Sequence, residues 1–261
     1  MREFFKIPGF PTVIVLGADG VERDRVVGFD GDAAGFVSTL QDWAENKKTL
    51  FRYLETWAKD TTDVEWNYRI ARRYESRYQN GLGQRYWRNV LKFDPDNQTG
   101  YWEEAVFNMA INSIREKSNP APLQELMAAT TNPDYRRSGY FALVRHFESS
   151  GDLEKTVTIY EKALQEFPQS TSFLNGFAWF IYEHKQSDRY LQGIKYAEQA
   201  VRLEPDADYL WDTLAWLYNA IDEHQKAVEA ISKALQLSPD SDYFKQTLTK
   251  MKYDLENNSP K

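Results

Sequence analysis

The chain has 261 residues, with 32 basic and 39 acidic side chains, a net charge of −7 and a pI near 5.2. An acidic protein does not neutralise phosphates, so these values argue against a nucleic-acid partner or an anionic membrane surface. Cysteine is absent, which excludes disulfides, thiolate metal sites and thiol catalysis in this chain. No apolar run approaches the ~20 residues of a membrane helix, no signal peptide is visible, and the cellular compartment stays open.

Two strands and a helix are predicted at the start of the chain. The run 10–16 is almost wholly apolar, which predicts a strand covered on both faces. Asp19 and Gly20 form a tight turn into a second strand over 21–29, so the strands make a hairpin. Asp32 then caps a helix whose apolar stripe consists of Phe36, Val37, Leu40, Trp43 and Ala44.

The following part of the chain is predicted to be helical. The segment 48–63 is interpreted as a linker helix. Two hairpin-like units are expected next, 64–97 and a more degenerate 98–136, with a break at Asn119 and Pro120. The first of these carries small and apolar residues at repeat-like offsets: Ile70, Ala71, Tyr74, Gly83, Trp87, Val90 and Pro95.

A regular repeat runs through the C-terminal half. The segments 137–170 and 208–241 carry the same residue types at the same offsets, and 171–207 repeats the pattern with a short insertion. A polar-faced capping helix is expected over 242–257. A fixed period of about 34 residues is typical of arrays of helical hairpins. The matching pairs are Tyr140 and Trp211, Leu143 and Leu214, Phe147 and Tyr218, Tyr160 and Ile231, and Ala163 and Ala234.

These repeats resemble the tetratricopeptide repeat family, so the sequence predicts a mainly α protein built as a helical solenoid. Most members of that family are binding scaffolds. The resemblance therefore implies a non-catalytic interaction module without cofactor or metal, which binds a protein or peptide partner. A small-molecule ligand is not expected, and the sequence identifies neither the partner nor the oligomeric state.

The small αβ segment at 1–47 resembles the second half of a thioredoxin fold. The resemblance rests on Phe10, Pro11 and Thr12 before an apolar strand, on the hairpin turn, and on Gly28 at the end of the second strand. It implies a cis peptide bond before Pro11 and a substrate platform formed by Phe10, Pro11 and Thr12. The Cys-x-x-Cys half of that family's fold has no counterpart in this chain.

Two interpretations of this front segment remain open. In one, the chain is a truncated form of a thiol-disulfide oxidoreductase fused to repeats, and the repeats hold the partner. In the other, it is a repeat scaffold with no redox parent, and the front segment caps the solenoid. The truncated parent is the favoured interpretation, because half a sheet exposes strand edges that proteins normally pair or cover.

The repeat family also implies a binding surface. The first helix of each hairpin lines a concave groove in that family, and aromatic side chains are common energetic anchors of interfaces. The alternative, left open by the sequence, is that Trp179 and Trp216 belong to the core. By their offsets, the expected groove residues are Phe141, Arg145, Asn175, Trp179, Tyr182, Tyr209, Asp212 and Trp216.

Two other groups of residues are interpreted as structural. The histidines His146, His184 and His224 lie far apart in the sequence without metal-ligand spacing, which predicts no metal site. Four arginines recur at helical spacing in an acidic protein, which favours a solvated helix face over a phosphate site. These arginines are Arg69, Arg72, Arg73 and Arg77.

Overall fold

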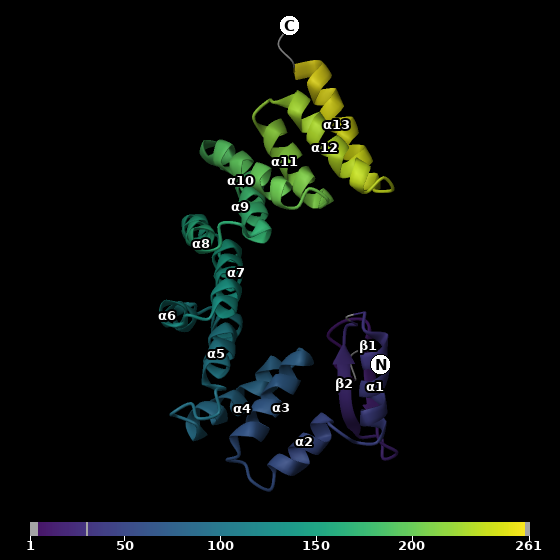
Figure 1. Ribbon diagram of the computed structural model, residues 1–261, viewed down its shortest axis with the longest axis vertical. Coiled ribbons are helices and arrows are strands. Elements are labelled where there is room, and N and C mark those ends of the chain that lie inside the picture. Colours follow the sequence, from purple (N-terminus) through teal and green to yellow (C-terminus); the bar gives the residue numbers. More distant parts are fainter. Residues whose placement is uncertain (1–4, 30, 259–261) are drawn as a thin grey trace. The chain divides into compact units, whose positions relative to one another are not determined.

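The computed structural model describes residues 5–29 and 31–258. It begins with an antiparallel hairpin of β1 (Thr12–Leu16) and β2 (Glu22–Val27), in which Ile14 lies opposite Arg25 (Figure 1). Helix α1 (Ala33–Ala44) follows, and its N-cap Asp32 accepts a hydrogen bond from the backbone N–H of Gly35 at 3.0 Å. The predicted order of two strands and a helix is confirmed.

The rest of the described chain is helical, which confirms the predicted solenoid with a small αβ segment in front. The 3-10 turn η1 lies where the sequence predicts an insertion in a repeat. The elements are α2 (Leu50–Trp57), α3 (Val64–Ser76), α4 (Asn80–Phe93), α5 (Trp102–Lys117), α6 (Ala121–Ala129), α7 (Pro133–Ser149), α8 (Leu153–Glu166), α9 (Thr171–Glu183), η1 (Ser187–Arg189), α10 (Tyr190–Leu203), α11 (Asp208–Ala220), α12 (His224–Leu237) and α13 (Asp242–Asn258).

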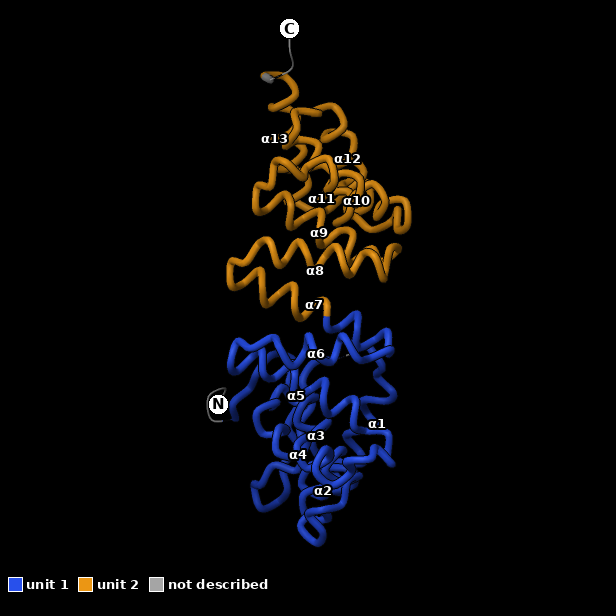
Figure 2. The backbone as a smooth tube through the Cα atoms, turned by 90° about the vertical axis from the view of Figure 1, so that its left-hand side faces the viewer, with its two compact units in different colours: residues 1–139 blue, residues 140–261 orange. Residues whose placement is uncertain are grey.

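The chain divides into two compact units, residues 1–139 and residues 140–261, which Figure 2 shows in blue and orange. We call them unit 1 and unit 2 and describe each by itself. The division does not fall at residue 47, because the hairpin and α2 are joined to the first repeat by the contacts given below. Within the described ranges, no helix combines the length and the apolarity needed to cross a membrane.

Helix α2 is part of the core of unit 1. Leu50 is buried in the same cluster as Trp87, and Trp57 packs on this cluster with its ring 5.2 Å from that of Tyr86. The indole N–H of Trp57 also donates to the side-chain oxygen of Asn67 at 3.1 Å. The segment predicted as a linker helix therefore supplies apolar side chains to the first repeat.

The hairpin differs from its prediction. The strand β1 is half-buried, and Leu16 is 44% exposed, so the expectation of cover on both faces is wrong for this segment. The most buried side chains belong to β2 and are charged, namely Asp24 and Arg25. A buried charge requires a partner, and Arg77, directly after helix α3, provides one for Asp24.

The four arginines of α3 and its C-cap, predicted to form a solvated face, are only partly exposed to solvent. Arg77 donates to Asp24 at 2.9 Å and also contacts Glu22. Arg73 lies 3.5 Å from Asp24 and donates to a backbone carbonyl at 3.0 Å. Arg69 and Arg72 have largely exposed side chains, as predicted. The prediction fails for Arg77 because its ionic partners lie more than fifty positions earlier in the chain.

Small residues allow the paired helices of each repeat to approach closely. The fourth residue of the second helix is buried and small in four repeats: Gly83 in α4, Thr156 in α8, Gly193 in α10 and Ala227 in α12. A Cβ added at Gly193 would lie 3.2 Å from the Leu217 side chain. The sequence period therefore reflects a packing requirement that recurs once per hairpin.

Candidate functional site

The first helices of the repeats in unit 2 place equivalent side chains in rows. One row runs from Arg145 through Trp179 and Trp216 to Lys250, with one member on each successive first helix. We call the surface that carries these rows the first-helix surface. It consists of the eight expected groove residues together with Tyr243 and Lys250 of α13.

Aromatic rings are in contact along this surface. The rings of Trp179 and Tyr182 lie 5.4 Å apart, and those of Tyr182 and Trp216 lie 5.5 Å apart. The ammonium of Lys250 sits 4.5 Å from the Trp216 ring centre, within the range of a cation–π contact. All three aromatic side chains are half-buried, so they are neither sealed in the core nor fully solvated.

A polar chain lies beside these rings. The Trp216 indole N–H donates to the Tyr243 hydroxyl at 3.1 Å, and that hydroxyl donates to Oδ2 of Asp212 at 3.2 Å. Burial raises the pKa of the Asp212 carboxyl to about 6, although hydrogen bonds from Tyr243 and Trp216 oppose this shift. The carboxylate is therefore held in surroundings that disfavour its charge.

The other expected groove residues take different places. Phe141 stacks on Phe173 with ring centres 4.2 Å apart and stays partly exposed, and Arg145 and Tyr209 are exposed. Asn175 is half-buried, and its side-chain oxygen accepts no hydrogen bond within the described residues. The row positions therefore hold aromatic, cationic and acceptor groups on one surface.

The sequence interpretation missed two members of this surface, Tyr243 and Lys250. The sequence predicts 242–257 only as a polar-faced capping helix. A signal was present, because Tyr243 stands one repeat period after Tyr209, and Lys250 stands one period after Trp216. The last helix thus continues the rows of the repeats.

The residues of the expected thioredoxin-like platform lie in unit 1. Phe10 is 74% exposed, and the peptide bond between Phe10 and Pro11 is cis. The Thr12 hydroxyl donates to the carbonyl of Gly9 at 2.6 Å, and the Gly28 amide donates to the carbonyl of Pro11 at 2.8 Å. These contacts fix the entry to β1 and its pairing with the end of β2.

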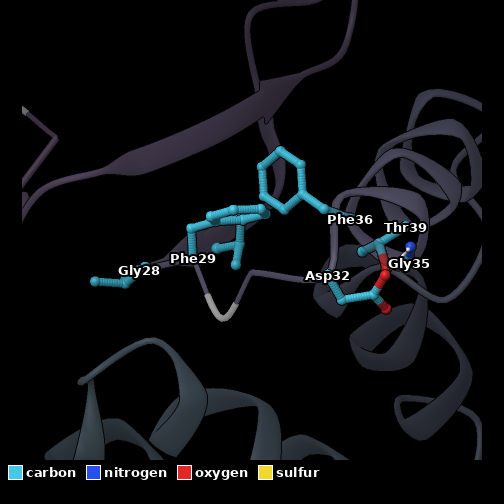
Figure 3. Close-up of a pocket in the computed structure, with 8 residues that line it drawn as sticks. Gly28, Phe29, Asp32, Gly35, Phe36 and Thr39 are labelled. Atoms are coloured by element: carbon cyan, nitrogen blue, oxygen red, sulfur yellow. Dashed lines mark hydrogen bonds between the residues drawn. The ribbon is translucent and has the colours of Figure 1, made fainter.

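A pocket of about 500 Å³ lies between the end of β2 and helix α1 (Figure 3). The rings of Phe29 and Phe36 meet edge to face at this pocket, with centres 5.5 Å apart. Among the lining residues that the structure describes, Asp32 is the one carboxylate, and this side chain caps α1. The described lining offers apolar surface and does not bring together a nucleophile and a base. The lining residues are Val26, Val27, Gly28, Phe29, Asp32, Gly35, Phe36 and Thr39.

One group in unit 2 has side chains of the types that bind metals. Ligand atoms of Glu148, Glu183 and His184 lie within 4.8 Å of one another, and His184 lies 3.2 Å from Glu148. Ligand spacing in the sequence does not indicate this group, because Glu148 and His184 belong to different repeats. A hydrogen bond between the His184 ring and the Glu148 carboxylate accounts for their contact without a metal ion.

Comparison with known proteins supports the repeat interpretation. Residues 209–241 match the family model of the tetratricopeptide repeat. No curated protein matches the chain significantly.

Several solved structures share the fold. The C-terminal part of a TPR repeat-containing protein from Cytophaga hutchinsonii aligns with a TM-score of 0.66 at 16% identity, over 87% of this chain and 88% of that chain. YrrB, described as a TPR protein with an unusual peptide-binding site, aligns with a TM-score of 0.55 at 10% identity, over 76% and 97%. The MamA protein aligns with a TM-score of 0.54 at 13% identity, over 67% and 92%. At these identities the likeness establishes the fold: a solenoid of tetratricopeptide type.

Proposed function

We propose that this tetratricopeptide-type chain is a non-catalytic scaffold that binds a protein segment on the first-helix surface of unit 2. One observation carries the proposal: the half-buried, mutually contacting rings of Trp179, Tyr182 and Trp216 lie on a single surface. Half-buried aromatic side chains lose their remaining exposed apolar area when a partner covers them, which makes them effective anchors of interfaces.

A peptide-like partner fits the composition of this surface better than a small molecule. The rows that run from repeat to repeat combine aromatic rings with polar and charged side chains. Such rows suit an extended or helical segment that contacts several helices at once. The neighbour YrrB is described as having a peptide-binding site, which supports the same class of ligand by analogy of fold alone.

The test is a selection from a random peptide library on the full chain, followed by affinity measurements on variants. Trp179→Ala and Trp216→Ala should each lower the affinity for the selected peptides about tenfold or more, since such anchors contribute ~2 kcal/mol or more to the binding free energy. Trp102→Ala is the matched control, because Trp102 is exposed on α5 of unit 1. Equal affinity of the wild type and both tryptophan variants for every selected peptide would overturn the proposal.

A narrower proposal concerns the front segment, residues 1–47. We infer that it corresponds to the second half of a thioredoxin-like domain, whose parent would act on disulfides of the partner held by the repeats. The order of β1, β2 and α1, and the hydrogen bond from Gly28 to Pro11, support this assignment. The alternative is a scaffold without a redox parent.

The coding sequence distinguishes these two alternatives. An upstream extension of the same reading frame that encodes Cys-x-x-Cys at the start of a helix is the expected result. A stop codon shortly before Met1, with no frameshift that restores the motif, would contradict the redox parent. The chain itself has no cysteine and should show no thiol–disulfide exchange, because that reaction needs a thiolate.

A further inference from the structure

Two buried acceptor atoms on the first-helix surface lack a hydrogen-bond donor. They are the side-chain oxygen of Asn175 and Oδ1 of Asp212, and neither receives a donor from any residue that the structure describes. Asn175 on α9 and Asp212 on α11 occupy equivalent positions of consecutive repeats, and these helices are in contact. A buried acceptor without a donor is costly, so two at equivalent positions point to a donor that is supplied from outside.

Asp212 is in addition a carboxylate without a cation. Within the described residues, no salt bridge includes it. Its surroundings are Asp208 on its own helix, Tyr182 on α9 and Tyr243 on α13. Lys250, also on α13, places its ammonium over the Trp216 ring. A buried carboxylate that faces hydroxyl and aromatic groups is the electrostatic complement of a cation.

The net charge of unit 2 also favours a positively charged partner. Residues 140–261 contain 19 Asp and Glu against 13 Lys and Arg, a net charge of −6, so this unit carries most of the acidic excess of the chain. A negative unit attracts basic segments over distances of about a Debye length, roughly 8 Å at physiological salt.

We propose that the segment bound by unit 2 presents a lysine or arginine side chain, whose cationic head donates to Asp212 and Asn175 and packs on the rings of Tyr182 and Trp216. The inference deepens the proposed function and rests on it. The carboxylate supplies a charge-assisted hydrogen bond, and the rings supply cation–π contacts. Oδ1 is closed to solvent, so a side chain that covers it must move when the cation enters.

The test compares three labelled dodecapeptides that share one serine–leucine background, with four variable positions occupied by lysine, glutamine or glutamate. Affinities for the full chain are measured by fluorescence anisotropy at neutral pH. The lysine peptide should bind about tenfold more tightly than the glutamine peptide, and the glutamate peptide should bind least.

The variants locate the effect. Asp212→Asn should lower the affinity of the lysine peptide about tenfold. The control Asp222→Asn alters an 89% exposed carboxylate and should change this affinity less than about twofold. Asn175→Asp adds a carboxylate and should raise the affinity of the lysine peptide about threefold. This second variant keeps the test informative if Asp212→Asn impairs folding, which circular dichroism would reveal.

Three results would overturn the inference. If the glutamine peptide binds as tightly as the lysine peptide and loses affinity with Trp216→Ala, the cation site is refuted and the proposed function stands. If none of the three peptides binds while peptides selected from the random library do, the cation site is refuted and the proposed function stands. An unchanged affinity of the lysine peptide for both Asp212→Asn and Asn175→Asp also refutes the cation site.

Discussion

The guanidinium of Arg77 donates to the carboxylate of Asp24 at 2.9 Å, and their side chains are only 6% and 0% exposed. The same carboxylate accepts a hydrogen bond from the backbone N–H of Leu50 at 2.7 Å. Strand β2, the start of α2 and the end of α3 thus meet at one side chain. This contact explains why the hairpin belongs to unit 1 instead of forming a separate appendage.

We expect Arg77→Met to lower the free energy of unfolding of unit 1 by about 3–5 kcal/mol, because it removes the guanidinium that is hydrogen-bonded to the buried carboxylate of Asp24. Arg52→Met is the control, since Arg52 is 60% exposed and pairs with an exposed glutamate, and its effect should stay below about 0.5 kcal/mol. Urea denaturation followed by circular dichroism measures both. Equal effects of the two substitutions would contradict a structural role for the buried pair.

Gly83→Ala should destabilise the first repeat by about 1–3 kcal/mol, because the new Cβ would lie 3.3 Å from the carbonyl oxygen of Ala71 and from the Cβ of Tyr74. Gly81→Ala is a matched control on the same helix. Its Cβ would meet only the end of the Glu116 side chain at 3.6 Å, so the higher helix propensity of alanine should leave the protein unchanged or more stable by up to about 1 kcal/mol. Thermal melts in which both variants behave alike would show that the helices are not closely packed at Gly83.

Asp212→Asn should stabilise unit 2 at neutral pH and have little effect in acid. The folded-state pKa of Asp212 is raised from 3.8 to about 6, so the folded protein holds this proton more tightly than the unfolded chain. Ionisation therefore removes stability as the pH rises from about 4 to 6, and the loss is complete above that range. The difference between these two pKa values corresponds to at most ~3 kcal/mol, which solvent screening reduces to about 1 kcal/mol. The measurement is the difference in unfolding free energy between the variant and the wild type at each pH. A difference that is independent of pH would contradict it.

Phe177→Ala and Trp179→Ala compare two aromatic residues on helix α9. Phe177 is completely buried and stacks on Tyr160 with ring centres 4.9 Å apart, so its truncation should cost about 3–5 kcal/mol. Trp179 is half-buried, so its truncation should lower the free energy of unfolding by roughly half as much, because less apolar area returns to water. Chemical denaturation measures both. A loss at Trp179 as large as that at Phe177 would favour the alternative that this tryptophan belongs to the core.

The repeat pattern made the helices of this chain predictable from its sequence. Small and apolar residues must recur at fixed offsets wherever two helices pack closely. The sequence period therefore predicts that residues such as Gly193 and Ala197 lie at a helix–helix contact. The position of η1 was predictable for the same reason, since an insertion interrupts the period. The front hairpin was predictable in its elements from its turn and its β-branched run.

Contacts between distant charged residues were not predictable. Asp24 and Arg77 are separated by 53 positions, and nothing in their local sequence distinguishes a buried ion pair from two solvated side chains. Glu148 and His184, which lie 36 positions apart, present the same difficulty. In the candidate site, the periodic positions identified the members on α9 and α11. The hydrogen bonds of Tyr243 and the unpartnered oxygen of Asp212 depend on side-chain directions, which periodicity does not determine.

The carboxylate of Asp24 also has a consequence for how unit 1 responds to ligands. Because this group holds β2, α2 and α3 together, the hairpin and the first repeat should open as a single cooperative block. Backbone amides of β2 and of α3 should then exchange with solvent at a common free energy. By linkage, any molecule that binds the folded hairpin should slow exchange in α3 without touching it. The front segment would in that case regulate the rigidity of the repeat that follows it.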